Sequence, residues 1–290
     1  MSIPSQPQKI IDYCLPTLKN LPNAALGKAL ESAFRVESEA METIEHCFRQ
    51  LTGDFHSPEK LKYFFRSWMM TNNSAMCVSG LGNRMTLQHL DGTPIQDKSA
   101  LFQALTSLHR ISDEDLGVGS ALLHWDLFYR MATSLCVTDD WQSTRYLTAE
   151  ADSFKRWKDA CSLKAPDLMT GLLTTLIHEI YTHGEVEYID PLFHQWVAAT
   201  SSFSEEERKR NLFWIAAHCN GTETAHFGHA SDATKHYCRA HGISLEAYDM
   251  EGIFRDYLKR KARVMDSISQ VLSFSPGGRM ALQAPVAKAA

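Results

Sequence analysis

Apolar residues recur at the spacing of an α-helix from about residue 28 to residue 272, and no stretch of five residues or more alternates in the manner of a β-strand. Glycine and proline fall between these stretches and mark the breaks. The pattern predicts an all-α protein, a single compact bundle of seven or eight helices. The expected helices are 26–51, 58–79, 98–110, 116–137, 142–162, 166–189, 205–230 with an extension to 241 left open, and 244–273.

The domain organisation follows from length and composition. A chain of 290 residues, 44% of them hydrophobic, can form one domain with a large core, and no linker rich in Pro, Gly or Ser divides it. We therefore expect an N-terminal extension at 1–25, one helical-bundle domain at 26–274 and a disordered C-terminal tail at 275–290.

The net charge of -5 gives no general attraction to nucleic acid or to an anionic membrane surface. No run reaches the ~18 apolar residues of a membrane span, and the N-terminus lacks the features of a secretory signal. The 7 cysteines form no Cys-x-x-Cys pair, which favours free thiols in a reducing compartment. We expect a cytoplasmic protein that binds a small molecule, not nucleic acid or a membrane; a homodimer stays open.

Two expected helices carry ionisable residues on their apolar faces. The helix at 166–189 continues its apolar stripe into His183 and Glu187 by steps of three and four residues, and the next core helix does the same with Glu223 and His226. Burying an isolated carboxylate costs several kcal/mol, so such groups are normally neutralised, paired or bound to a cation. One metal ion would satisfy all four side chains. The Glu-x-x-His spacing is also the one by which helical bundles hold iron or manganese.

Further ligands are needed, because a two-metal site usually has about six. His229 lies three residues beyond His226 and is a candidate third imidazole, although it also fits a row on the helix surface. Asp126 and His124 flank the apolar stripe of the helix at 116–137, and Glu37 falls on the stripe of the first helix. These earlier helices leave the choice of ligand open.

Three aromatic residues, Trp125, Tyr129 and Tyr181, are expected to line the core or a substrate pocket. His178 and Glu185 project to the side of their helix opposite the apolar stripe, so we expect both to be solvated.

The arrangement of these acids and histidines resembles the haem-oxygenase-like diiron oxidase and oxygenase superfamily. The resemblance depends on Glu187 on one helix and on the pair Glu223 and His226 on the next core helix, and it covers roughly residues 110–241. Members typically carry His-x-x-x-acid-x-x-His on the last ligand helix and a carboxylate with a histidine on an earlier one. The chain departs from that pattern where Cys219 takes the place of the first His, with His218 adjacent to it.

The earlier helix departs as well, since it offers Asp126 where the family has Glu. Three histidines could substitute for the missing ligand, His183, His218 or His229; alternatively, one of the two metal positions is degenerate.

The resemblance implies an oxidase or oxygenase with one or two iron ions, or manganese, that activates O2 and acts on an amino-acid-like or fatty-acid-like metabolite in a biosynthetic pathway. Glu187, Glu223 and His226 would then be catalytic, with His183 as a further ligand. Two alternatives remain at this point. One is a metal-free enzyme of the same fold that uses His and Glu as acids and bases. The other is a non-enzymatic helical module that binds a ligand or a partner through a buried polar network.

Overall fold

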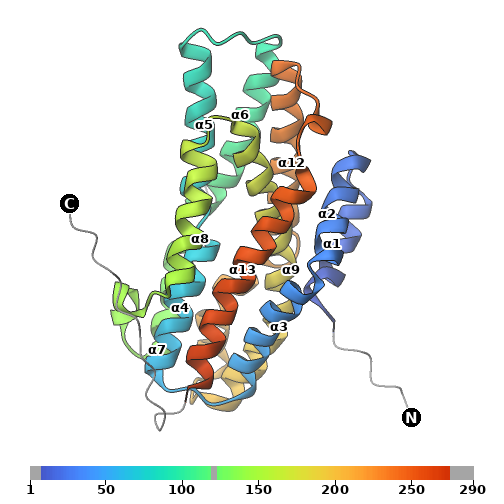
Figure 1. The fold of residues 1–290 in the computed structure, drawn as a ribbon. Coiled ribbons are helices and arrows are strands. Elements are labelled where there is room, and N and C mark those ends of the chain that lie inside the picture. Colours follow the sequence, from blue (N-terminus) through green and yellow to red (C-terminus); the bar gives the residue numbers. More distant parts are fainter. Residues whose placement is uncertain (1–7, 119–122, 275–290) are drawn as a thin grey trace, which may run out of the picture.

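The computed structural model describes residues 8–118 and 123–274, and within these ranges the chain is helical and contains no β-strand (Figure 1). The predicted all-α fold class is confirmed. The α-helices are α1 (Ile10–Lys19), α2 (Ala24–Val36), α3 (Ser38–Gly53), α4 (Pro58–Asn72), α5 (Ala75–Leu90), α6 (Lys98–Asp115), α7 (His124–Cys136), α8 (Ala149–Asp159), α9 (Leu168–Thr200), α10 (Glu205–Asn211), α11 (Phe213–His218), α12 (Thr222–His241) and α13 (Met250–Ser273). The predicted tail at 275–290 lies outside the described residues.

Several expected helices are divided, so their number exceeds the predicted seven or eight. Glu37, with φ -92° and ψ 34°, separates α2 from α3 inside the helix expected at 26–51. Asn73 and Ser74 separate α4 from α5 in the same way. These interruptions fall at residues other than glycine or proline, which is why the sequence pattern did not reveal them.

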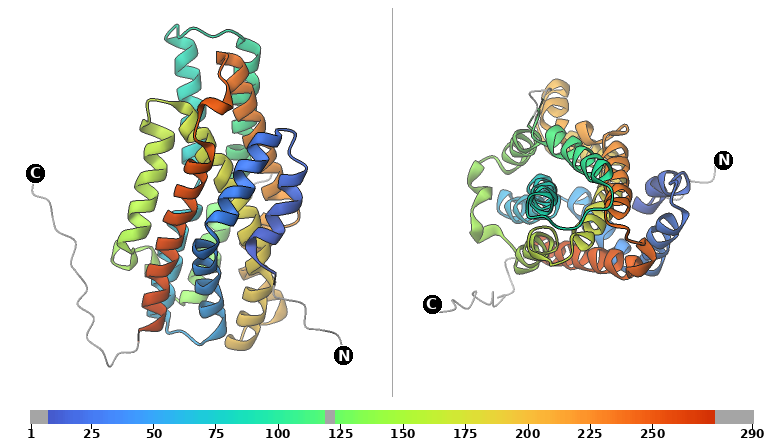
Figure 2. Two further views of the ribbon diagram at one scale, coloured as in Figure 1. Left: turned by 45° about the vertical axis from the view of Figure 1, so that its right-hand side comes forward. Right: turned by 90° about the horizontal axis from the view of Figure 1, so that it is seen from above.

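The long helix α9 occupies the centre of the bundle and packs against α1, α3, α12 and α13 (Figures 1 and 2). Nearly every residue in its first two thirds is buried. The prediction that His178 and Glu185 are solvated is therefore wrong: their exposed fractions are 3% and 0%. A helix surrounded by other helices has no solvent face, so its polar residues are buried whichever way they point.

The short helix α1 belongs to the core of the bundle, although its residues fall in the range expected to form an N-terminal extension. It packs on α9 at Gly184, where a Cβ atom would lie 2.7 Å from the carbonyl oxygen of Ile10 and 2.5 Å from Sγ of Cys14. Both distances are too short for any side chain. The absence of a side chain at Gly184 thus allows the two helices to approach closely.

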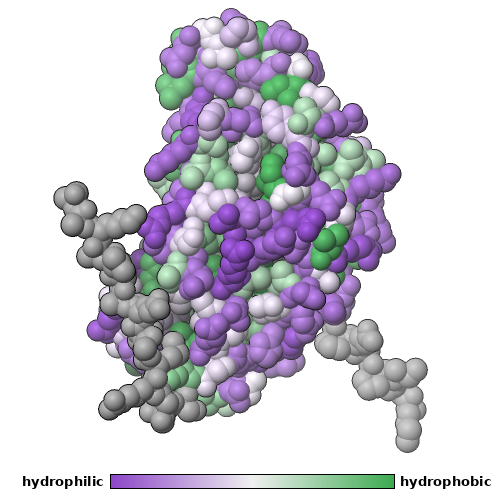
Figure 3. Space-filling model, in the orientation of Figure 1, coloured by the Kyte–Doolittle hydropathy of each residue, from purple (hydrophilic) through white to green (hydrophobic). Residues whose placement is uncertain are grey.

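The break between α11 and α12 matters most for the site. Asn220 and Gly221 adopt positive φ angles of 57° and 105°, a backbone region that favours glycine and asparagine. The helix axis therefore changes direction between His218 and Glu223. In the described ranges no helix combines the length and apolar character needed to cross a bilayer. The face in Figure 3 is largely hydrophilic, with apolar residues scattered over it.

Candidate metal centre

Three buried side chains from α9 and α12 converge in the middle of the bundle. Nδ1 of His226 lies 3.7 Å from Oε2 of Glu179 and 3.7 Å from Oε2 of Glu223. None of the three side chains is more than 2% exposed. Each offers one ligand atom, and these atoms all lie within 4.8 Å of one another. We call Glu179, Glu223 and His226 the inner triad.

The second nitrogen of His226 is also held. Nε2 lies 3.0 Å from Oε2 of Glu114, near the C-terminal end of α6. An imidazole that donates one N–H to a carboxylate directs its other nitrogen at a fixed point, which is the usual arrangement behind a metal-binding histidine. Glu114 thus orients His226 toward the two carboxylates of the inner triad.

The charges of the inner triad are strongly coupled. Burial raises the pKa of Glu179 well above its ordinary value, and the neighbouring charge of Glu223 raises it further. Burial opposes the charged form of His226, but its contacts with Glu114 and Glu223 outweigh this and raise the pKa of His226 to about 12. Two acids forced together in an apolar interior favour a bound cation, whether a proton or a metal ion.

A second group, from α6, α7 and α11, lies beside the first. Asp115, His124 and His218 offer ligand atoms that all lie within 4.8 Å of one another, and we call them the outer triad. Nδ1 of His124 lies 3.1 Å from Oδ1 of Asp115. The ring centroids of His124 and His218 are 4.4 Å apart. The outer triad borders a pocket and is less buried than the inner one.

The tautomer of His218 is fixed by the backbone. Its Nδ1 lies 2.6 Å from the carbonyl oxygen of Trp214, so Nδ1 carries the hydrogen and Nε2 keeps a free lone pair. Burial lowers the pKa of His218, which keeps the ring neutral. Nε2 lies 3.8 Å from Oε1 of Glu223 and so connects the two triads through a carboxylate that faces both.

Two observations show that these residues suit a metal ion. Oε1 of Glu179 is buried and has no hydrogen-bond partner, and Nδ1 of His124 is buried without an aligned hydrogen bond despite its proximity to Asp115. Buried polar atoms are normally satisfied, so unsatisfied atoms among clustered carboxylates and imidazoles leave lone pairs that a cation could accept. Together the triads supply three imidazoles and three carboxylates, the mixed N and O ligands that iron and manganese prefer.

The predicted convergence of His183 and Glu187 with Glu223 and His226 is not found. His183 faces α1, beside the backbone of Tyr13. Oε1 of Glu187 accepts a hydrogen bond of 3.0 Å from the backbone N–H of Asn220 and so stabilises the start of the break before α12. Glu187 thus lies beside the break before α12, and Glu179, two turns earlier on α9, is the carboxylate that reaches the inner triad.

The other predicted ligands and lining residues have different positions. His229 is half-buried on α12 and Asp126 is exposed in the first turn of α7, and neither belongs to a triad. Trp125 lines the pocket as expected, whereas Tyr129 does not, because its ring packs on Trp141. Tyr181 is buried away from the pocket and donates a hydrogen bond to Glu185.

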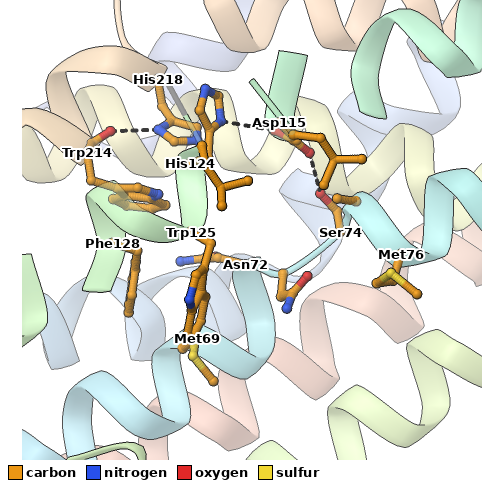
Figure 4. Close-up of a pocket in the computed structure, with 14 residues that line it drawn as sticks. Met69, Asn72, Ser74, Met76, Asp115, His124, Trp125, Phe128, Trp214 and His218 are labelled. Atoms are coloured by element: carbon orange, nitrogen blue, oxygen red, sulfur yellow. Dashed lines mark hydrogen bonds and ion pairs between the residues drawn. The ribbon is translucent and has the colours of Figure 1, made fainter. Parts of the chain in front are cut away.

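The pocket has a volume of about 310 Å³, at the lower end of the range for small-molecule sites. Figure 4 shows Asp115, His124 and His218 together on one side and Met69 and Trp125 on the other. The described residues of the lining are predominantly apolar and aromatic and include neither lysine nor arginine. The outer triad is thus accessible from the pocket, whereas the inner triad lies behind it.

Comparisons with known proteins establish the fold. Neither protein-family models nor curated proteins give a match. Among solved structures, a TenA homolog from Pseudomonas syringae pv. tomato is similar, with a TM-score of 0.62 over 89% of this chain and 96% of that chain, at 15% sequence identity. That protein has a haem-oxygenase-like helical fold. This chain therefore has the haem-oxygenase-like all-helical fold that the sequence predicted.

Proposed function

We propose that the protein is a non-haem iron-dependent oxidase or oxygenase that activates O2 and acts on a small amino-acid-like or fatty-acid-like metabolite. The observation that carries the proposal is the pair of adjoining triads, which place three imidazoles and three carboxylates around Glu223 inside a haem-oxygenase-like bundle. Glu179, Glu223 and His226 would hold one ion, and Asp115, His124 and His218 the other, with Glu223 facing both. Manganese suits the same ligands.

Iron bound there would supply electrons for the reduction of O2. The protein residues supply position and protection. Glu114 orients His226, and the carbonyl of Trp214 holds His218 in the tautomer that presents Nε2. The apolar pocket beside the outer triad would hold the substrate next to the metal and exclude water. Trp214 and Phe128 form the wall that packs against this side of the site.

The test is anaerobic loading with ferrous iron, followed by removal of free metal and measurement of bound iron. We expect about two ions per chain in the wild type, from the ligand count of such sites. The double variant Glu223→Ala with His226→Ala should lose most of this iron. Glu187→Gln and His183→Ala are matched controls, because both residues lie on α9 close to the triads but outside them; iron content should be unchanged.

A wild type that binds no iron, or a double variant that binds as much as the wild type, would refute the proposal. Loss of iron in the His183 or Glu187 control would instead indicate that the metal ligands are those expected from the sequence. Oxygen consumption by the loaded protein with candidate acids would then identify the substrate.

A metal-free acid–base enzyme is the second candidate. It is favoured by the contacts of His226, which lies within 3.7 Å of two carboxylates and 3.0 Å of a third and can hold a proton between them. The outer triad is less well explained by this candidate. Without a metal ion, the acidic neighbours of His124 and His218 are Asp115, 3.1 Å from His124, and Glu223, 3.8 Å from His218. Turnover that persists in excess chelator would favour this candidate.

A further inference from the structure

Arg66 is a half-buried cation on α4 that contacts Met69, one of the residues that line the pocket. Its Nε atom is buried and makes no hydrogen bond. Among residues 8–118 and 123–274 no carboxylate forms an ion pair with it, and burial alone lowers the pKa of Arg66. Arg84, also half-buried, shows the usual alternative: its guanidinium donates to the carbonyl oxygens of Ser162 and Ala165. A buried N–H such as that of Nε is costly without an acceptor, unless a ligand supplies one.

The position of Arg66 relates it to the pocket wall. Arg66 and Met69 lie three residues apart on one face of α4, and Met69 lines the pocket together with Asn73, which follows the end of the helix. Nη1 of Arg66 lies 4.0 Å from Sδ of Met69. In Figure 4 Met69 lies across the pocket from His218 and Asp115. The unbranched, flexible side chain of Met69 therefore contacts both the guanidinium and the end of the pocket remote from the outer triad.

The chemistry of the lining determines what this cation could bind. No lysine or arginine is found among the lining residues that the structure describes, and the walls include the rings of Trp125, Phe128 and Trp214. A guanidinium presents a planar fork of donors that matches a carboxylate, and one fork is enough for a monoanion. A dianionic phosphate would call for more donors than this end of the pocket supplies.

We propose that Arg66 recognises the carboxylate of the substrate. This carboxylate would lie at the end of the pocket near Met69. The apolar or aromatic body of the substrate would lie against the tryptophan rings and extend toward the outer triad. The substrate is accordingly a small organic acid whose reacting part is remote from its acidic group. This inference rests on the proposed function only in taking the pocket as the substrate site.

The test measures binding to metal-free protein, so it does not depend on iron. The fluorescence of Trp125 and Trp214 reports occupancy while 4-phenylbutyrate, or its neutral analogue 4-phenylbutanamide, is titrated. The wild type should bind the acid about tenfold more tightly than the amide, the range of one charge-assisted contact. Arg66→Gln should lose this preference while its affinity for the amide stays the same, which also shows that its pocket is intact. Arg66→Lys should retain part of it.

Arg263→Gln is the matched control, since Arg263 is an exposed arginine on α13. It should keep the full preference for the acid. Equal binding of acid and amide by the wild type, no binding of either, or a preference that survives in Arg66→Gln would each overturn the proposal. If the preference for the acid depends on Arg66 but the protein binds no iron, Arg66 is still the acid-binding residue. Only the proposed oxygenase activity is then refuted.

Discussion

Nε2 of His218 lies 3.8 Å from Oε1 of Glu223. Between these residues lie Asn220 and Gly221, whose positive φ angles separate α11 from α12. In a continuous helix, residues five apart point in directions roughly 140° apart, so the two side chains could not meet. The break at Asn220 and Gly221 brings them together. It also decides that His218, and not Cys219, belongs to the site.

Replacement of His218 and of its neighbour should therefore have different effects. His218→Ala removes an imidazole of the outer triad, and we expect about half of the bound iron to be lost. Cys219→Ala should leave iron content unchanged, because Cys219 lies in neither triad and burial raises the pKa of its thiol to about 12, which keeps it out of the thiolate form that binds metals. Metal analysis of both variants measures the bound iron per chain and so distinguishes His218 from Cys219 as the ligand. Loss of iron in Cys219→Ala alone would mean that the cysteine is the ligand.

Gly221→Ala should weaken the outer triad through the backbone. The φ angle of 105° strains any residue with a Cβ atom, and we expect a loss of about 1 kcal/mol in the free energy of unfolding together with reduced iron content. Gly228→Ala is the control: Gly228 lies within α12, nothing lies within 4 Å of an added Cβ, and alanine there should stabilise the helix by about 0.5 to 1 kcal/mol. Chemical denaturation and metal analysis measure both effects. Equal stability of the two variants would contradict the prediction.

Metal binding should become tighter as the pH rises. In the metal-free protein, burial opposes the charge on His226, but its acidic neighbours raise its pKa to about 12, so it holds a proton at neutral pH. The pKa of Glu179 is raised by burial and by Glu223, so this carboxyl group also favours its protonated form. A metal ion must displace these protons. Apparent affinity should increase by up to about tenfold per pH unit for each proton released.

Titration with Mn²⁺ between about pH 6 and pH 8 tests the pH dependence, and calorimetry in buffers of different ionisation enthalpy counts the released protons. An affinity that does not change with pH would show that the inner triad does not bind the ion. Glu187→Gln should keep the wild-type dependence.

The buried ion pair between Lys261 and Glu185 should be sensitive to the loss of one partner. Nζ of Lys261 lies 2.9 Å from Oε2 of Glu185, and both side chains are 0% exposed. Lys261→Met leaves a carboxylate buried without its cation, and we expect a loss of about 3 to 5 kcal/mol in the free energy of unfolding. The double variant Lys261→Met with Glu185→Gln should recover a large part, because the amide can still accept the hydrogen bond from Trp68. A double variant no more stable than the single one would contradict this account.

The sequence predicted the fold class and part of the candidate site. Helical periodicity was sufficient for the all-α bundle, and the spacing of Glu223 and His226 places both on one helical face, which the structure shows to be buried. Glu179 flanks the apolar stripe of its helix, a position from which it could turn inward, and in the structure it is buried. The expectation for Glu187 assumed a single inner face for α9, whereas in the structure nearly every residue in the first two thirds of this helix is buried.

The outer triad was harder to predict. Asp115 ends one helix and His124 begins the next, so neither follows from the periodicity within a helix, and the interruption at Asn220 moved His218 from a flank to the centre of the site. The same limitation applies to Lys261, which lies on the apolar face of the last helix and would be expected to extend its ammonium group to solvent. Its partner, Glu185, lies 76 positions earlier in the sequence (261 − 185).

The order of the residues alone determined which segments form helices and which carry acids and histidines among apolar neighbours, because periodicity and residue type act over one or two turns. Which of those groups meet was decided only by the packing of the helices. The packing of α9 against α12, the approach of the end of α6 to the start of α7, and the break before α12 all involve more than one helix, so periodicity within a single helix does not reveal them. The choice of Glu179 and His218 over Glu187 and Cys219 follows from these contacts.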